Sequence, residues 1–290
     1  MNTPVIRVLE PHDHAALEAF LRSRVESSMF LISNMRSAGL ADHGQAYGGT
    51  YAAAFEGGKI IAVVAHYWNE NMILQAPAHV GALCRAAVEG SKRPLGGFIG
   101  PCDQVSAAQE ALGIAGANIQ MDETEKLYTL GLDDLREPDD LRSGKVSGRR
   151  IESRDLDLIT EWRIAYSLET LGQEDSSQWQ ARCRRSAERS LKEGRTWVLE
   201  VEGVPVACTS FNAAIGEVVQ VGGVWTPPEL RRRGYGRSIV AVSLLDARSE
   251  GVETAILFTG ETNIGAQKAY AALGFRHIGD YRMLFLRSPL

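Results

Sequence analysis

The sequence has few cysteines, and they are not arranged in any pattern typical of a structural site. Only four of the 290 residues are cysteine, and no two of them form a C-x-x-C pair; they are Cys84, Cys102, Cys183 and Cys208. This spacing argues against a zinc ribbon or a disulfide framework and is typical of proteins in a reducing compartment. We therefore predict a cytoplasmic protein that holds no metal ion.

Long apolar runs are also lacking. No stretch approaches the ~20 apolar residues that a membrane-spanning helix requires. The first residues, MNTPVIRVLE, contain no apolar signal segment. We expect neither a membrane partner nor secretion.

The chain has no strong excess of charge of either sign. Its 31 Lys+Arg and 36 Asp+Glu give a net charge of −5, whereas a nucleic-acid-binding protein normally shows a broad basic face. We therefore expect no nucleic-acid partner. The part of the chain from Lys145 onward is the more basic one, which would attract a small polyanionic ligand.

The most informative stretch is a turn rich in glycine and arginine that follows an apolar strand. Glycines let the backbone bend with its amides pointing one way, and a helix predicted from Gly236 onward offers unpaired N-terminal amides to an anion. The alternative is a basic turn before an ordinary helix. The pattern favours the first interpretation, a phosphate site. Its residues are Arg231, Arg232, Arg233, Gly234, Tyr235, Gly236 and Arg237.

Hydrophobic periodicity predicts the same order of elements twice: strand, helices, hairpin, strand, helix, strand, helix and strand. We predict a first domain over 1–132, a charged linker with little to bury over 133–148, and a second domain over 149–290. The repeat is one of architecture rather than of recognisable sequence.

Two motifs in the second domain are specific in combination. The turn from Arg231 to Gly236 fits the pattern Arg/Gln-x-x-Gly-x-Gly/Ala, and a later segment fits Asn-x-x-Ala-x-x-x-Tyr-x-x-x-Gly-Phe with Asn263, Ala266, Tyr270, Gly274 and Phe275. In both motifs residues 149–290 resemble the GNAT superfamily of acetyl-CoA-dependent N-acetyltransferases. The resemblance implies an α/β fold (an α+β mixed sheet) of two tandem GNAT-like domains, each a mixed, mostly antiparallel sheet flanked by helices.

The resemblance also implies a binding site for acetyl-CoA as cosubstrate. The backbone of Val224 and Thr226 would pair with the pantetheine arm like an extra strand. Gly222 and Gly223 suggest a bulge that splays this strand from its neighbour. The implied cofactor-binding residues are Val224, Trp225, Thr226, Arg231, Arg232, Arg233, Gly234, Tyr235, Gly236, Arg237, Ser238 and Asn263.

For catalysis, the resemblance implies that Tyr270 protonates the leaving thiolate. The acceptor amine must lose a proton before attack, because a lysine-like amine has a pKa near ~10.4. Glu217 at the start of the cofactor strand is the candidate base, although Gln220 also fits the family's glutamate position and Glu169 or a solvent-derived base remains open. Cys208 is interpreted as a core residue.

The first domain departs from the family where its phosphate loop should stand. The strand predicted over 72–75 is followed by Ala76-Pro77-Ala78-His79-Val80-Gly81, which lacks Arg-x-x-Gly-x-Gly, and Pro77 has no amide donor. We infer that this degenerate half does not bind acetyl-CoA in the usual way. It completes the acceptor pocket, forms a homodimer or stabilises the second domain.

We predict an acyltransferase that moves an acetyl group from acetyl-CoA by direct transfer to a primary amine. The prediction favours an amine of a small molecule over an amine of a protein. The alternatives are a protein lysine or N-terminal acetyltransferase and a non-catalytic acyl-CoA-binding regulatory protein. By analogy with the family fold, the residues expected near the acceptor are Trp162, Tyr166, Glu169, Phe211 and Asn212.

Overall fold

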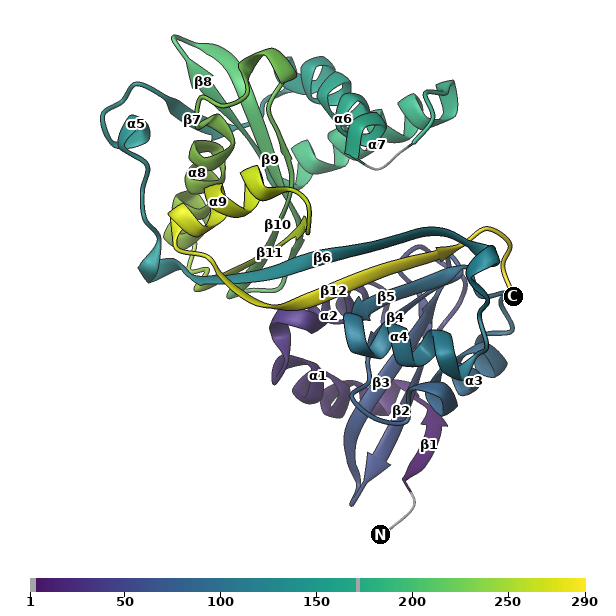
Figure 1. Ribbon diagram of the computed structural model, residues 1–290. Helices are drawn as coiled ribbons and strands as arrows, with labels where there is room; N and C mark the ends of the chain where they lie inside the picture. The colour runs from purple at the N-terminus through teal and green to yellow at the C-terminus, as the bar shows by residue number, and fades with distance from the viewer. Residues whose placement is uncertain (1–3, 171–172) are drawn as a thin grey trace. The chain divides into compact units, whose positions relative to one another are not determined.

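The computed structural model describes residues 4–170 and 173–290. The chain forms two compact units, and we describe each by itself (Figure 1). Unit 1 comprises the chain up to Leu127 together with Ile278–Leu290, and unit 2 is the continuous segment Tyr128–His277. Among the helices of the described residues, none combines the length and the apolar composition that a membrane crossing requires.

Unit 1 is a mixed sheet with helices on both faces. Its strands run in the order β1-β2-β3-β4-β5-β12, and every pair is antiparallel except the parallel pair β4–β5. The elements are β1 (Val5–Val8), α1 (His14–Arg22), α2 (Val25–Ala38), β2 (Gly49–Glu56), β3 (Lys59–Tyr67), β4 (Asn71–Gln75), α3 (Val80–Ser91), β5 (Gly97–Pro101), α4 (Cys102–Ala111), the first part of β6 (Ile119–Gly131) and most of β12 (Arg276–Leu286).

The central strands of unit 1 are apolar along almost their whole length because both of their faces are covered. In β2 only the last two residues are not fully enclosed. One face packs on α3 and α4 through a cluster that includes Val64, Leu83 and Val105, while α1 and α2 pack on the other face.

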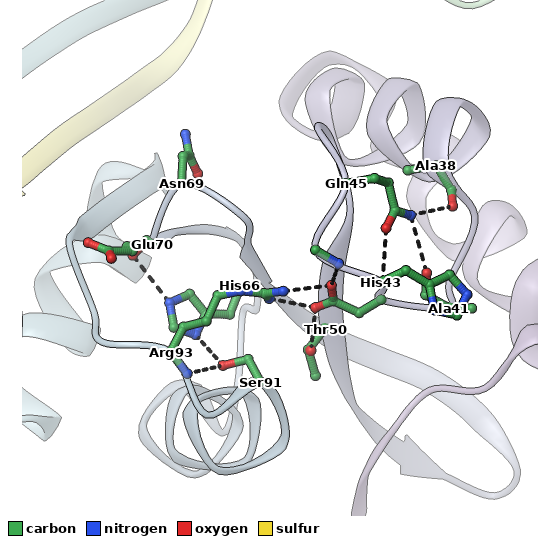
Figure 2. Close-up of polar contacts among 12 residues, drawn as sticks. Ala38, Ala41, His43, Gln45, Thr50, His66, Asn69, Glu70, Ser91 and Arg93 are labelled. Carbon is green, nitrogen blue, oxygen red and sulfur yellow. Dashed lines mark hydrogen bonds and ion pairs between the residues drawn. The ribbon is translucent and has the colours of Figure 1, made fainter.

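A polar cluster links two loops of unit 1 to β2, β3 and the end of α3, and Figure 2 shows His66, Ser91, Arg93 and Thr50 within it. We call it the polar clasp; it consists of Asp42, Thr50, His66, Ser91 and Arg93. Arg93 forms a two-pronged ion pair with Asp42, at 2.5 and 2.7 Å, and Thr50 donates to the same carboxylate. His66 Nδ1 lies 2.8 Å from Ser91 Oγ, and its Nε2 faces two backbone carbonyls at 3.2 Å. Nε2 therefore carries the proton and the Ser91 hydroxyl donates to Nδ1.

Unit 2 repeats this architecture. Its strands run in the order β11-β10-β9-β8-β7, with β10–β11 as the parallel pair. The elements are the last residues of β6, then α5 (Asp139–Arg142), β7 (Ser147–Arg150), α6 (Leu156–Thr170), α7 (Ser177–Glu193), β8 (Thr196–Val201), β9 (Val204–Ala214), β10 (Val218–Trp225), α8 (Tyr235–Ser249), β11 (Thr254–Gly260) and α9 (Ile264–Leu273). A helix over 156–171 is expected from the sequence; Leu171 lies outside the described residues.

Two apolar clusters cover the two faces of the unit 2 sheet. The cluster beneath α8 and α9 contains Val219, Val221 and Tyr270. The cluster beneath α6 and α7 contains Trp162 and Trp225. Each unit is thus a mixed, mostly antiparallel sheet flanked by helices, and the predicted fold class is confirmed.

The ranges of the two units differ from the predicted domains 1–132 and 149–290. Residues 133–148 do have apolar side chains to bury: Leu135, Leu141 and Val146 pack against the α8 cluster, so this segment belongs to unit 2. The closing strand β12 is present as predicted, but its antiparallel partner is β5 of unit 1. Sequence periodicity identifies a strand and does not identify its partner, so the ranges of the compact units differ from those of the predicted domains.

Candidate active site

The parallel strands β10 and β11 are paired along only the first half of their length. Their paired residues run from Val218 with Thr254 to Val221 with Leu257, whereas the strands themselves continue to Trp225 and Gly260. The predicted bulge is present, because the β9–β10 register shifts between Gly222 and Trp225. Gly223 has φ +57°, a left-handed conformation that favours glycine. The backbone beyond Val221 is therefore free of a β11 partner.

The bulge also turns side chains to the opposite face of the sheet. Val219 and Val221 contact the α8 cluster. On a regular strand alternate residues share a face, so without a bulge the Trp225 side chain would also point toward the α8 cluster. Instead Val224 contacts the α8 cluster, and Trp225 packs beneath α6 and α7. The extra residue thus sets Val224 toward the start of α8.

The arginine turn leads directly into the N-terminus of α8. Gly234, the residue before the helix, has φ +82°, and the first amides of the helix have no intrahelical partner. A Cβ on Gly236 would lie 3.7 Å from Thr226 Oγ1 and 3.8 Å from Val224 Cγ1. A methyl group there would touch both side chains, so the start of α8 lies directly beside the free end of β10, and its first amides are available to an anion.

The arginines of this turn have different partners. Arg231 binds Glu169 of α6 through both terminal nitrogens, at 2.7 and 2.8 Å, and its guanidinium lies 4.9 Å from the centre of the Trp225 ring. Arg237 differs, since its buried Nε has no hydrogen-bond partner among the described residues. A phosphate oxygen would satisfy this atom, so Arg237 fits the predicted cosubstrate best.

The second motif forms the cap and the body of α9. The Asn263 side chain accepts a hydrogen bond from the Ala266 amide at 3.1 Å, which fits a helix N-cap. Asn263 therefore has a structural task whether or not it also contacts cosubstrate. Tyr270 is 7% exposed and its ring lies 6.0 Å from that of Phe275, within the α8 cluster.

The two carboxylates considered as the general base, Glu217 and Glu169, differ in their surroundings. Glu217 precedes the paired end of β10, where its carbonyl accepts from Glu253 and Thr254. Strand rise puts it about 20 Å from Gly223. Glu169 is engaged by Arg231, which lowers the pKa of that carboxyl.

The side chains expected around the acceptor do not share one face. Tyr166 meets Trp225 edge to face at 6.2 Å, beneath α6. Asn212 adjoins the bulge, because a Cβ on Gly222 would collide with its amide. Phe211 packs on Trp197 within the α8 cluster, on the other face of the sheet from Tyr166. Neighbouring strand residues point to opposite faces, which separates Phe211 from the rest.

The cysteines are not arranged for chemistry. All four lie in the described residues and are free thiols. Burial raises the pKa of Cys208 to about 12, which fits its interpretation as a core residue. Within the described residues, no group of three or more histidine, cysteine or acidic side chains is placed to hold a metal ion.

In unit 1 the parallel strands β4 and β5 stay close together beyond their last paired residues, Ile73 and Ile99. Gly100 of β5 approaches Leu74 of β4 so closely that a Cβ would lie 3.0 Å from the Leu74 Cβ. The Ala76 amide, which follows β4, is taken by the Gln104 side chain at 2.6 Å. This geometry supports the inference that the first half does not hold acetyl-CoA in the usual way.

One inward-pointing polar residue of unit 2 was not predicted from the sequence. Arg163 of α6 points inward to hydroxyls of α7 and β9. A comparison of the two halves position by position would have singled it out, because the first half has an apolar residue there.

Parts of the chain match known proteins. The model of the acetyltransferase (GNAT) family matches residues 156–275. A mycothiol acetyltransferase from Thermobispora bispora is 39% identical over 64 residues, which make up 22% of this chain and 21% of that protein. The match thus spans about a fifth of the length of this relative.

Solved structures resemble the chain over nearly its whole length. A GCN5-related N-acetyltransferase from Sphaerobacter thermophilus has a TM-score of 0.61 at 13% identity, covering 97% of this chain and 94% of that one. A tandem GNAT protein from the clavulanic acid biosynthesis pathway has a TM-score of 0.58 at 14% identity, covering 99% and 100%. Identities this low show a shared fold. Residues 156–275 match the acetyltransferase (GNAT) family, and the splayed strands and the glycine–arginine turn lie within the matched residues.

Proposed function

We propose that this protein transfers an acetyl group from acetyl-CoA directly to a primary amine of a small molecule, at one site in unit 2. The observation that carries the proposal is the separation of β10 from β11 beyond Val221, next to the open N-terminus of α8. A free strand edge beside a helix N-terminus suits a ligand with a peptide-like arm and a diphosphate.

The residues divide the work as follows. Val224 and Thr226 offer backbone groups to the arm, while the first amides of α8 and Arg237 hold the diphosphate. Tyr270 donates a proton to the sulfur as the thiol leaves. Solvent takes the proton of the amine, since Glu217 lies at the far end of β10 and the pKa of Glu169 is lowered by Arg231. Most of the acceleration then comes from holding the amine against the thioester.

Turnover of small amines tests the proposal. The full chain is incubated with acetyl-CoA and a panel of amines, amino acids and basic peptides, thiol release is followed, and products are identified by mass spectrometry. We expect an acetylated small amine.

Other outcomes would contradict the proposal in distinct ways. Products from peptides alone would indicate a protein acetyltransferase. Tight acetyl-CoA binding without turnover of any acceptor would indicate a regulatory acyl-CoA-binding protein.

A further inference from the structure

Arg163 carries a charge into the interior between α6, α7 and β9 without a carboxylate to balance it. Its guanidinium donates to Ser186 Oγ at 2.8 Å, Ser190 Oγ at 3.2 Å and Ser210 Oγ at 3.5 Å. No Asp or Glu of the described residues pairs with it. Arg189 lies nearby and adds further positive charge.

A guanidinium has five N–H donors, and the serines occupy three of them. Serine hydroxyls are neutral, so they satisfy donors without offsetting the charge. Arg163 is half-buried, and this burial lowers the pKa of its guanidinium. Charges withdrawn from water are normally paired with an opposite charge, whereas the partners of half-buried Arg163 are neutral hydroxyls.

Unit 1 supplies an internal comparison, because its first helix can be placed on α6 without ambiguity. Both units open with the same two-pronged ion pair at the same spacing, and in each the helix begins directly after the aspartate; the pairs are Arg7–Asp13 and Arg149–Asp155. Counted from this pair, Arg163 corresponds to Leu21. Leu21 is completely buried.

The serines also have apolar counterparts. The hairpins superpose by register, because Glu56 faces Lys59 in one and Val201 faces Val204 in the other, so Ser210 corresponds to Ala65. Counted back from the glycines that end α2 and α7, the two helix serines correspond to two further completely buried residues, Leu31 and Met35. Unit 2 therefore holds a polar site where unit 1 has solid apolar core.

This polar site adjoins the bulge. Ser210 pairs with Gly222 across β9–β10, and its Oγ lies 3.9 Å from the position of a Cβ on Gly223. Gln220 stands two residues earlier on the same face of β10; it is 3% exposed, and its Oε1 has no partner among the described residues. A cation and an unsatisfied acceptor thus flank the face of the bulge that lies beneath α6 and α7.

We propose that the acceptor is an amino acid. Its carboxylate binds Arg163, and its amine lies at the bulge, where it donates a hydrogen bond to the side-chain oxygen of Gln220. This inference rests on the proposed function and specifies its substrate class. The short path from Arg163 through Ser210 to Gly223 suits a molecule in which few bonds separate carboxylate from amine. A carboxylate matches the planar fork of a guanidinium.

Matched acceptors test the class. The standard L-amino acids, their carboxamides and O-phosphoethanolamine are compared as acceptors under saturating acetyl-CoA. We expect at least one amino acid to exceed its own carboxamide about 100-fold in kcat/KM. Equal rates for acid and amide, or turnover of O-phosphoethanolamine in preference to every amino acid, would overturn the carboxylate assignment while leaving acetyl transfer to amines intact.

Variants locate the site. Arg163→Leu, alone and combined with Ser210→Ala, installs the residues found in unit 1 and should abolish the preference for acid over amide with the KM for acetyl-CoA unchanged. Arg163→Lys should keep part of it. Arg184→Leu is the matched control, because this α7 arginine is exposed and already paired with Asp157. Full preference in the Arg163→Leu enzyme would refute the inference.

A binding measurement separates the inference from the proposed function. Calorimetry with the preferred amino acid, or with each standard amino acid if none turns over, is run on the protein saturated with coenzyme A. Binding that disappears in Arg163→Leu but not in Arg184→Leu supports the site even if no acetyl group moves. Absence of amino-acid binding to the wild-type chain contradicts the inference.

Discussion

Tyr270 is the residue whose loss should affect the chemical step most. It packs within the α8 cluster, so Tyr270→Phe keeps the ring and removes the proton donor. We expect kcat to fall about 10²–10⁴-fold with the KM for acetyl-CoA nearly unchanged, as measured by steady-state thiol release. Tyr128→Phe, in the same cluster and similarly buried, is the control and should retain full kcat. An active Tyr270→Phe enzyme would move the proton donor elsewhere.

Arg237 is expected to contribute more to cosubstrate binding than Arg231 does, because Arg231 is already held by Glu169. A hydrogen bond to a charged group contributes ~1.5–3 kcal/mol, so Arg237→Ala should raise the Kd for acetyl-CoA about 10–100-fold. Calorimetry measures this directly. The exposed Arg142→Ala controls for loss of one positive charge, and an equal effect of both substitutions would mean that only net charge matters.

At the scale of elements, the bulge in β10 is the feature most exposed to substitution. Gly223 has φ +57°, a conformation that costs other residues roughly 1–2 kcal/mol. Gly223→Ala should lower the free energy of unfolding by about that amount and also reduce kcat/KM, because relaxing the bulge would let the free edge close.

A second glycine provides the control for this prediction. Gly203, in the β8–β9 turn, has φ +78° and nothing within 4 Å of its missing Cβ. Gly203→Ala should cost similar stability, measured by urea unfolding, and leave kcat/KM intact. If both variants lose activity in step with stability, the bulge has no special role.

The elements were largely predictable because their cues are local. The glycine turn, the Asn263 cap and the bulge at Gly222 each follow from a few neighbouring residues, and the structure contains all three. The partner of β12 could not be predicted, since pairing is a long-range choice that periodicity does not encode. The inward direction of Arg163 depends likewise on packing between α6 and α7.

At the scale of the whole molecule, acid should weaken unit 1 through the polar clasp. Burial lowers the pKa of His66 below its usual value, near ~6.5 in an unfolded chain. The neutral ring accepts from Ser91 (Figure 2); protonation would reverse that contact and leave a charged ring partly withdrawn from water beside Arg93. Because the folded pKa is the lower one, the stabilisation is complete above about pH 6.5 and is lost as pH falls through the folded value.

Thermal unfolding between pH 8 and pH 5 measures this loss. We expect Tm to fall across the range in the wild-type chain and less steeply in His66→Gln, which begins from a lower Tm because the clasp is incomplete. His43→Gln removes an exposed histidine from the same region (Figure 2) and should keep the wild-type slope. Equal slopes of Tm against pH in all three proteins would mean that His66 does not contribute to the loss of stability in acid.

The return of β12 to β5 has a consequence for how the chain is made. A ribosome releases Ile278–Leu290 only after all of Tyr128–His277, so unit 2 is complete in sequence while unit 1 still waits for its last strand. Domains usually fold in the order of synthesis, and here that order is reversed at the final step. Until β12 arrives, β5 presents an open strand edge, which is a template for pairing with other chains. A late stop codon would therefore leave the sequence of unit 2 whole and leave unit 1 with an exposed strand edge that a chaperone would have to protect.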